Sequence, residues 1–245
     1  MKLIALGSVH GNLHALEACL RDADASGYDL MVHTGDLAGC GPQPDECIAL
    51  LRHRNVIGPR GPWDAALAAG DDEAPWVPGG AGAQRLAASC YQWTRRAISA
   101  ASRRLLASLP FEVGRMEGRF QLGVYHASPI DTRTVLMPGS PEARFREVGD
   151  ASASSVIVLG GAPMFFHRLA GGRHFINTAS VGMPADGGGM TGYAIAQIDT
   201  GVAVTFRRLA YDAQGAARVA MERGLPAEWV SASGASVMDM TVGAV

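Results

Sequence analysis

The chain has 245 residues, a length that suits one large α/β domain with a well-buried core. Its formal net charge is −2 and only 18% of its residues are charged, so no strong field attracts nucleic acid or an anionic membrane surface. Lys2 is the only lysine, and the remaining basic residues are arginines. An arginine bias without an excess of positive charge does not indicate a nucleic-acid-binding protein.

The first half of the chain alternates between strand and helix patterns. Residues 2–7 and 28–34 are apolar runs of strand length. Residues 13–25 and 44–54 repeat apolar side chains at helical spacing. Short buried strands that alternate with helices predict βαβ units and a parallel sheet.

The middle of the chain reads as a loop followed by helices, and the second half is rich in strands. Residues 70–82 are rich in Gly, Pro and Asp and predict a surface loop. Residues 83–108 predict two helices that separate near Ser99 and end before Pro110. The expected strands of the second half are 119–127, 155–160, 173–177, 192–198 and 202–209.

No linker divides the chain, so we expect one domain over residues 1–232. Thr200-Gly201 is a plausible hairpin turn between the last two strands, and 187–189 is a triple-glycine loop expected to be mobile. Residues 233–245 lack periodicity and are expected to form a loosely ordered tail.

The four cysteines show no paired spacing of the zinc-binding or redox type. They are Cys19, Cys40, Cys47 and Cys90. The apolar run at residues 3–6 is too short for a signal peptide or a membrane span. We therefore expect reduced thiols in a cytoplasmic protein.

Functional side chains of α/β folds gather in loops beyond the carboxyl ends of the strands. Six such loops stand out by their glycines and polar residues. They are Gly7-Ser8-Val9-His10-Gly11-Asn12, Gly35-Asp36 with Gly41-Pro42, Gly61-Pro62-Trp63-Asp64, His126-Ala127-Ser128-Pro129, Gly160-Gly161-Ala162-Pro163, and Asn177 through Gly182. In order and spacing they resemble the small prokaryotic branch of the calcineurin-like metallophosphoesterases, which reads D-x-H-G-N, G-D-x-x-x-x-G-P, G-N-H-D, H-G-S-P, G-H-T-H and N-P-G-S-V-G.

The resemblance covers nearly the whole chain and implies an α/β fold of the four-layer αββα sandwich type. In the family, two metal ions clamp the phosphate and activate a bridging water, and seven side chains serve that centre. Three of the seven remain here, namely His10, Asp36 at the bridging position, and His126. On the family geometry, His10 and His126 belong to different metal positions.

The other positions of the family centre have changed. The first Asp is Ser8, the Asn of G-N-H-D is Pro62, and the two His of G-H-T-H are Gly161 and Pro163. The His that resembles a general acid in relatives is Trp63, whose indole N–H does not act as an acid near neutral pH. Loss of even an outer-shell partner costs about 10–100-fold in metal affinity. We therefore expect no two-metal site and no metal cofactor.

Three readings of the retained residues stay open. His10, Asp36 and His126 can be packed loop residues, metal-free acid/base groups, or ligands of one weakly bound divalent ion such as Zn, Mn or Fe. A Ser8 nucleophile is disfavoured because the G-x-S-x-G context is absent.

The altered pocket has a candidate set of ligand-binding residues. Trp63 and Phe165, with Phe166, can form an apolar wall or can fill the vacated space. Arg60 can meet a phosphate or carboxylate. The full expected set is Ser8, Asn12, Arg60, Trp63, Asp64, Phe165 and His167.

The sequence therefore predicts a metallophosphoesterase-fold protein that no longer hydrolyses phosphoesters and binds a small molecule or a partner in the ancestral cleft. The first alternative is an enzyme with metal-independent acid/base chemistry. The second is a weak phosphodiesterase or phosphatase with one metal. Relatives of this scaffold often self-associate, so a homo-oligomer is also an expectation.

Overall fold

The computed structural model describes residues 1–77, 80–185 and 189–232. Most of the expected triple-glycine loop and the expected tail at 233–245 lie outside the described residues. The helices are α1 Leu13–Ser26, α2 Pro44–His53, α3 Pro62–Ala69, α4 Ala81–Ala97, α5 Ala100–Ser108, α6 Glu142–Asp150, α7 Ala213–Glu222 and α8 Ala227–Ala232. The strands are β1 Lys2–Leu6, β2 Leu30–His33, β3 Glu112–Glu117, β4 Phe120–Tyr125, β5 Val156–Leu159, β6 Phe165–Ala170, β7 Arg173–Thr178, β8 Met190–Ile198 and β9 Val202–Ala210.

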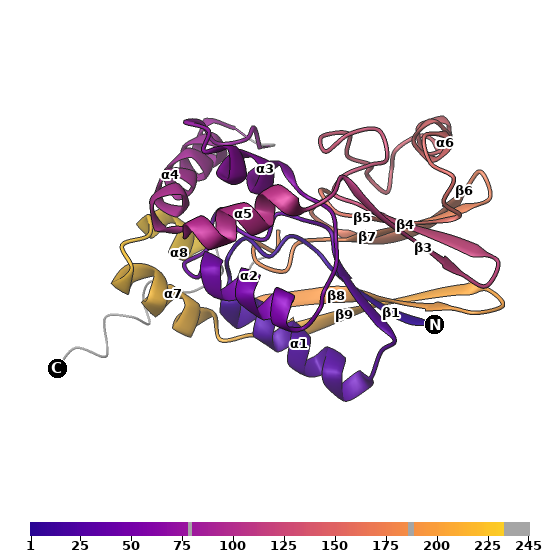
Figure 1. Cartoon of the computed structure of the whole chain (residues 1–245), viewed down its shortest axis with the longest axis horizontal. Helices are drawn as coiled ribbons and strands as arrows, with labels where there is room; N and C mark the ends of the chain where they lie inside the picture. Colours follow the sequence, from indigo (N-terminus) through magenta and orange to yellow (C-terminus); the bar gives the residue numbers. More distant parts are fainter. Residues whose placement is uncertain (78–79, 186–188, 233–245) are drawn as a thin grey trace.

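Two sheets lie face to face, with most of the helices gathered along one side and end of the pair (Figure 1). The first sheet has the order β2-β1-β8-β9, with β1 parallel to β2 and antiparallel to β8. The second has the order β3-β4-β5-β7-β6, with a parallel centre of β4, β5 and β7. The parallel βαβ pair predicted for the first half of the chain is thus confirmed.

Strand side chains sort into three apolar cores, and these define four layers. In β1, Leu3 and Ala5 face the second sheet, whereas Ile4 and Leu6 face the helices. In β5, Val156 and Val158 face the first sheet, whereas Ile157 and Leu159 pack towards α6 (the buried members of this third core also include Phe145). Because alternate residues of a strand point to opposite faces, one buried run supplies two cores. The expected αββα sandwich is confirmed.

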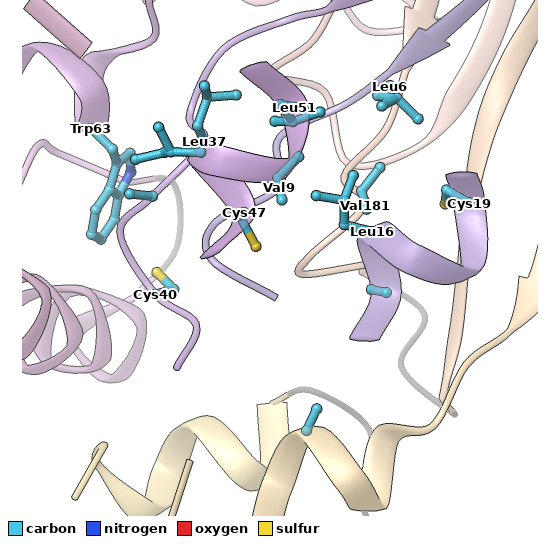
Figure 2. Packing of buried hydrophobic residues seen from close by; sticks show 14 of the residues in the cluster. Leu6, Val9, Leu16, Cys19, Leu37, Cys40, Cys47, Leu51, Trp63 and Val181 are labelled. Atoms are coloured by element: carbon cyan, nitrogen blue, oxygen red, sulfur yellow. The ribbon is translucent and has the colours of Figure 1, made fainter. Parts of the chain in front are cut away.

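The helical core carries several residues of the motif loops. Figure 2 shows Trp63 beside Leu37 and Cys40, and Val9 close to Leu16 and Val181. Loops that follow different strands therefore share one apolar cluster, which fixes their positions relative to the sheets.

Helix boundaries follow local capping chemistry. The Asn12 side chain accepts a hydrogen bond from the Ala15 N–H at the start of α1, as an N-cap residue does. The predicted break near Ser99 is confirmed, because the Ser99 hydroxyl caps α5 by accepting the Ser102 N–H. In the described ranges, no helix is long and apolar enough to cross a bilayer.

Candidate functional site

The loops after β1 and β2 are joined through their backbones. The N–H groups of Val9 and His10 both donate to the Asp36 carbonyl, at 3.0 and 2.9 Å. His10 and Asp36 themselves have φ values of 51° and 54°, in the left-handed region that His and Asp enter more readily than most residues. These two retained residues are thus held in unusual conformations by mutual hydrogen bonding.

The loop after β7 closes against the first loop at positions where only glycine fits. A Cβ on Gly7 would lie 1.5 Å from the Ala179 carbonyl oxygen, and one on Gly182 would lie 1.8 Å from the Val9 carbonyl oxygen. The Ser8 carbonyl accepts the N–H groups of Val181 and Gly182 at 3.0 Å. The close approach of these two loops therefore requires glycine at both positions.

Asp36 lies at the centre of the retained residues. It is only 4% exposed, its Oδ1 accepts the Trp63 backbone N–H at 2.9 Å, and its Oδ2 lies 3.6 Å from His126 Nε2. Burial raises the pKa of Asp36 to about 7, and hydrogen bonds from the backbone of Trp63 and Asp64 oppose the shift. This carboxyl group can therefore exchange a proton near neutral pH.

His126 is oriented by a backbone carbonyl. Its Nδ1 lies 2.7 Å from the Thr34 oxygen, so Nδ1 carries the proton and Nε2 presents its lone pair towards Asp36. Burial lowers the pKa of His126, with the Thr34 carbonyl acting in the opposite direction. The imidazole is therefore neutral at pH 7 unless it takes a proton from the Asp36 carboxyl.

Asp64 serves the backbone of the loops. Its carboxylate accepts the N–H groups of Asp36 at 2.7 Å, Leu37 at 2.8 Å and Gly61 at 3.0 Å, and the residue is fully buried. Burial raises the pKa of Asp64 to about 7, and these three donors oppose that shift. All its short contacts go to the backbone, so Asp64 clamps two loops together rather than facing a ligand.

Trp63 is packed beside His10. The two rings form an edge contact with centroids 5.6 Å apart, and a second edge contact joins Trp63 to Tyr91 at 6.0 Å. Trp63 is 4% exposed, and a Cβ on Gly39 would lie 2.4 Å from its ring. His10 Nδ1 has no hydrogen-bond partner, and burial lowers the pKa of this imidazole to about 4. We call His10, Asp36, Trp63, Asp64 and His126 the central cluster.

The residues present do not fit a two-metal centre. Each ion position keeps only two side-chain donors, because Asp36 is shared between His10 and His126. The position of one lost imidazole is Gly161, where φ is +82° and a Cβ would lie 3.0 Å from Val135 Cγ2. No group of three or more His, Cys, Asp or Glu in the described part of the chain is placed to hold a metal ion. Stable zinc sites use at least three protein ligands.

Several expected ligand-binding residues lie outside the central cluster. The Arg60 guanidinium donates to the Ala107 carbonyl at 3.4 Å, on the side of α5. Phe165 packs on Phe206 with centroids 5.2 Å apart, at the facing edges of the two sheets. Phe166 does not join it but packs on Phe145 under α6, because neighbouring strand residues face opposite sides. This placement does not support an apolar wall built from these two residues.

Asn12 and His167 are also accounted for by other contacts. Asn12 is fully buried, and its side-chain amide donates to the Gly182 carbonyl at 3.0 Å besides capping α1. His167 lies on β6 and pairs with His174 at the sheet edge. Of the expected ligand-binding set, Ser8, Trp63 and Asp64 therefore stay with the retained residues.

Among the described residues, no cation contributes to the pKa shifts of the central cluster. The charged groups that shift the pKa values of its members are other members of the cluster. Arg168, like Arg60, points elsewhere: it donates to the Ser140 carbonyl at 2.7 Å and lies over the Phe145 ring. An anionic phosphate would therefore meet buried carboxyl groups without a cation to offset them.

Three supporting residues were not in the expected set of site residues, although two of them belong to the motif loop at Asn177 through Gly182. Thr34 orients His126 through its carbonyl, and Ala179 has a φ of 50° where the family motif has glycine. Asn177 is 1% exposed; its amide holds the carbonyls of Ala162 and Met164, while its Oδ1 has no partner. The replaced glycine of N-P-G-S-V-G was the visible signal for Ala179, whereas backbone contacts leave no sequence signal.

The chain is similar to known phosphoesterases in sequence and in fold. The family profile of the calcineurin-like phosphoesterases matches residues 1–98. An uncharacterised protein of Methanocaldococcus jannaschii is 24% identical, with 93% of this chain and 95% of that protein covered. A metallophosphoesterase of Sphaerobacter thermophilus is 25% identical with a TM-score of 0.74, covering 96% of this chain and 99% of the other. A hypothetical protein of Pyrococcus horikoshii is 19% identical with a TM-score of 0.81 over the same shares, and shares the fold.

Proposed function

We propose that this chain, whose residues 1–98 match the calcineurin-like phosphoesterases and which has a metallophosphoesterase fold, acts by binding rather than by hydrolysis. The ligand that we expect at the central cluster is a small molecule that carries no phosphate group, or an uncharged segment of a partner protein. The observation that carries the proposal is the donor set: two donors for each ion position, with Trp63 packed on His10.

Electrostatics supports the choice of occupant. A phosphoester needs metal ions or arginine forks to offset its charge. The central cluster offers the partly protonated carboxyl of Asp36 and neutral imidazoles instead. Groups of that kind suit hydroxyl, amide or amine groups, with which they exchange hydrogen bonds.

Two measurements test the loss of hydrolysis. Elemental analysis of the purified protein is expected to give far fewer than two equivalents of Mn, Fe or Zn. A bis-aryl phosphate assay with added Mn²⁺ is expected to give no turnover above buffer. Two tightly held ions, or Mn²⁺-dependent turnover that His126→Ala abolishes, would overturn the proposal in favour of residual phosphoesterase activity.

A third measurement tests the occupant. Inorganic phosphate and AMP are expected to leave the melting temperature unchanged in a thermal-shift assay, since a ligand that binds only the folded state raises it. Uncharged compounds that do raise it should lose their effect in Ser8→Ala or His126→Ala. Stabilisation by phosphate that depends on His126 would contradict the absence of a phosphate site.

The contact between Asp36 and His126 supports a second candidate function, metal-independent acid/base catalysis. Their 3.6 Å separation lets a bound hydroxyl or water bridge them, and burial brings the pKa of Asp36 to about 7. Once a substrate is found, Asp36→Asn and His126→Ala should each abolish turnover while the fold persists. His53→Ala, on the exposed end of α2, is the matched control and should keep full activity.

The cysteines support a reducing location. All four are free and buried, and buried free thiols persist where glutathione and thioredoxin keep them reduced. We therefore place the protein in the cytoplasm as part of the proposal. Thiol titration of protein unfolded directly from cells should give four reactive groups.

A further inference from the structure

One edge of the first sheet is formed by β9, a strand of nine residues. It pairs with β8 in one unbroken register, from Met190 opposite Ala210 to Ile198 opposite Val202, so no bulge turns this edge away. Among the described residues, no backbone hydrogen bond outside the β8–β9 ladder involves residues 202–206. Because an edge strand directs every second N–H and C=O away from its neighbour, this stretch offers backbone donors and acceptors to a further strand.

The other three sheet edges are blunted, as the edges of soluble proteins usually are. The edge strand β2 is only four residues long, and Ile57 bridges it on its outer side. β3 carries three charged residues. β6 carries Arg168, which donates to carbonyls of the loop at 138–140. By contrast, residues 202–206 of β9 include no charged residue, proline or glycine, so this edge has none of these protections.

The side chains along this edge are incompletely covered. Val202, Val204 and Phe206 face the second sheet but are only partly buried. Ala203 and Thr205 point to the opposite face of the strand and are exposed. β-Branched and aromatic side chains stabilise a sheet when a neighbouring strand packs beside them, so a further strand at this edge would add such contacts.

We propose that β9 pairs with β9 of a second copy of this chain, antiparallel and about a two-fold axis at Ala203, which joins the two first sheets into one continuous sheet. A contact about a two-fold axis closes on itself and gives a dimer rather than a fibre. At this register Val202 opposes Val204 of the second copy. Directly opposed residues share a face, so these apolar side chains lie together on the side of the second sheets.

The charges favour this register and a copy of the same strand as the partner. An axis at Ala203 places Arg207, whose side chain is 46% exposed beside Asp22, opposite the exposed Asp199 that precedes β9 in the other copy. Opposite charges directly across two strands stabilise their pairing. An axis at Val204 would place Arg207 opposite an uncharged residue and would lose this pair. One strand therefore supplies both members of each opposed pair, apolar and charged.

Analytical ultracentrifugation of the tag-free full chain at low salt, over a dilution series, tests the pairing. We expect a species of twice the chain mass of 25.6 kDa that dissociates on dilution. Ala203→Lys places two ammonium groups opposite each other at the axis, and Ala203→Glu places two carboxylates there. Each variant should raise the Kd of the dimer at least about tenfold, because like charges juxtaposed across an interface oppose association. An equimolar mixture of the two variants should restore the dimer, since the axis then joins charges of opposite sign.

Gln197→Lys is the matched control. Gln197 lies opposite Ala203 on β8 and is exposed on the same face, but it is inside the sheet rather than at its edge. The Kd of this variant should stay within about twofold of wild type, as for a surface substitution away from the contact. Circular dichroism should show that every variant is folded.

Three results would overturn the pairing. Wild-type protein at the single-chain mass throughout the series would remove it. A dimer that Ala203→Lys leaves unchanged would place the interface elsewhere. Dissociation of both variants without rescue in their mixture would show that Ala203 does not oppose itself. None of these results depends on what the central cluster binds, so the two proposals fail independently.

Discussion

Replacing Trp63 with alanine separates a packing role from a ligand-binding role for this side chain. Trp63 is 4% exposed and packs on His10, Tyr91 and the backbone of Gly39. Removing a large buried aromatic side chain costs about 3–5 kcal/mol, because lost burial adds to the cavity left behind. For a chain of this size, about 2–4 °C of melting temperature corresponds to each kcal/mol, so Trp63→Ala should lower Tm by roughly 6–20 °C.

The assay is thermal and urea unfolding of wild type, Trp63→Ala and a matched control. Trp76→Ala is the control, because Trp76 is 71% exposed and its loss should stay within about 0.5 kcal/mol. Indole should raise the Tm of Trp63→Ala more than that of wild type, since an apolar cavity binds an apolar guest. A Tm within 2 °C of wild type, a margin of about 1 kcal/mol or less, would show that Trp63 lines an open pocket and would refute the packing argument.

Two further predictions concern stability. The Asp22 carboxylate accepts hydrogen bonds from Tyr193 Oη at 2.6 Å and from the Arg207 guanidinium at 2.7 and 3.0 Å. Asp22→Asn should therefore lower the free energy of unfolding, measured in urea at pH 7, by about 1 kcal/mol. The Arg207 hydrogen bond lowers the pKa of Asp22 in the folded state, so the stability that Asp22 contributes is complete above its unfolded pKa of about 3.9 and disappears as the pH falls through the lower folded pKa. Asp22→Asn should therefore reduce the loss of unfolding free energy at acid pH. An unchanged loss would show that the Asp22 hydrogen bonds do not stabilise the fold. Ala179→Gly should raise Tm by about 1–3 °C, because glycine tolerates the φ of 50°, and a lower Tm would show that the backbone there is not strained.

Most of the strands that sequence patterns predicted have buried side chains, and β9, which has none, was predicted from its apolar alternation at Val202, Val204 and Phe206. Every residue of β5 is buried, and such runs are unmistakable. The two strands that were missed, β3 and β6, are the edges of the second sheet. β3 has no fully buried residue and β6 has two, so no regular apolar alternation marks them.

The helices that the sequence predicted are likewise those with a clear apolar pattern. The amphipathic helices α1, which Asn12 caps, and α2, which begins at Pro44, were predicted within one or two residues. α3 was missed because it begins inside a motif loop, with Pro62 and Trp63 in its first turn, and its apolar residues show little periodicity. α7 is alanine-rich and buries its small residues against the helical core. Alanine favours helix, but its small apolar surface gives a weak pattern.

The proximity of the three retained residues was predictable from the motifs, whereas the directions of the surrounding side chains were not. Motif order brought His10, Asp36 and His126 together correctly, because strand-end loops of one sandwich meet at one edge. Side-chain direction is set by packing that motifs do not encode. Arg60 and Phe165 have the right chain position for a pocket wall, yet contact α5 and β9 instead.

The loops of the central cluster combine strained backbone with few side-chain donors for a metal ion. Left-handed conformations at His10 and Asp36 each cost on the order of 1–3 kcal/mol relative to ordinary backbone, and such strain persists only where the surroundings enforce it. Here the Asp64 carboxylate and the hydrogen bonds between the loops enforce it. These loops therefore present the buried His126 imidazole and the Asp36 carboxyl group to each other. Under the proposed function, this arrangement exchanges hydrogen bonds with an uncharged molecule, because none of the described residues brings to the central cluster the positive charge that a phosphate requires.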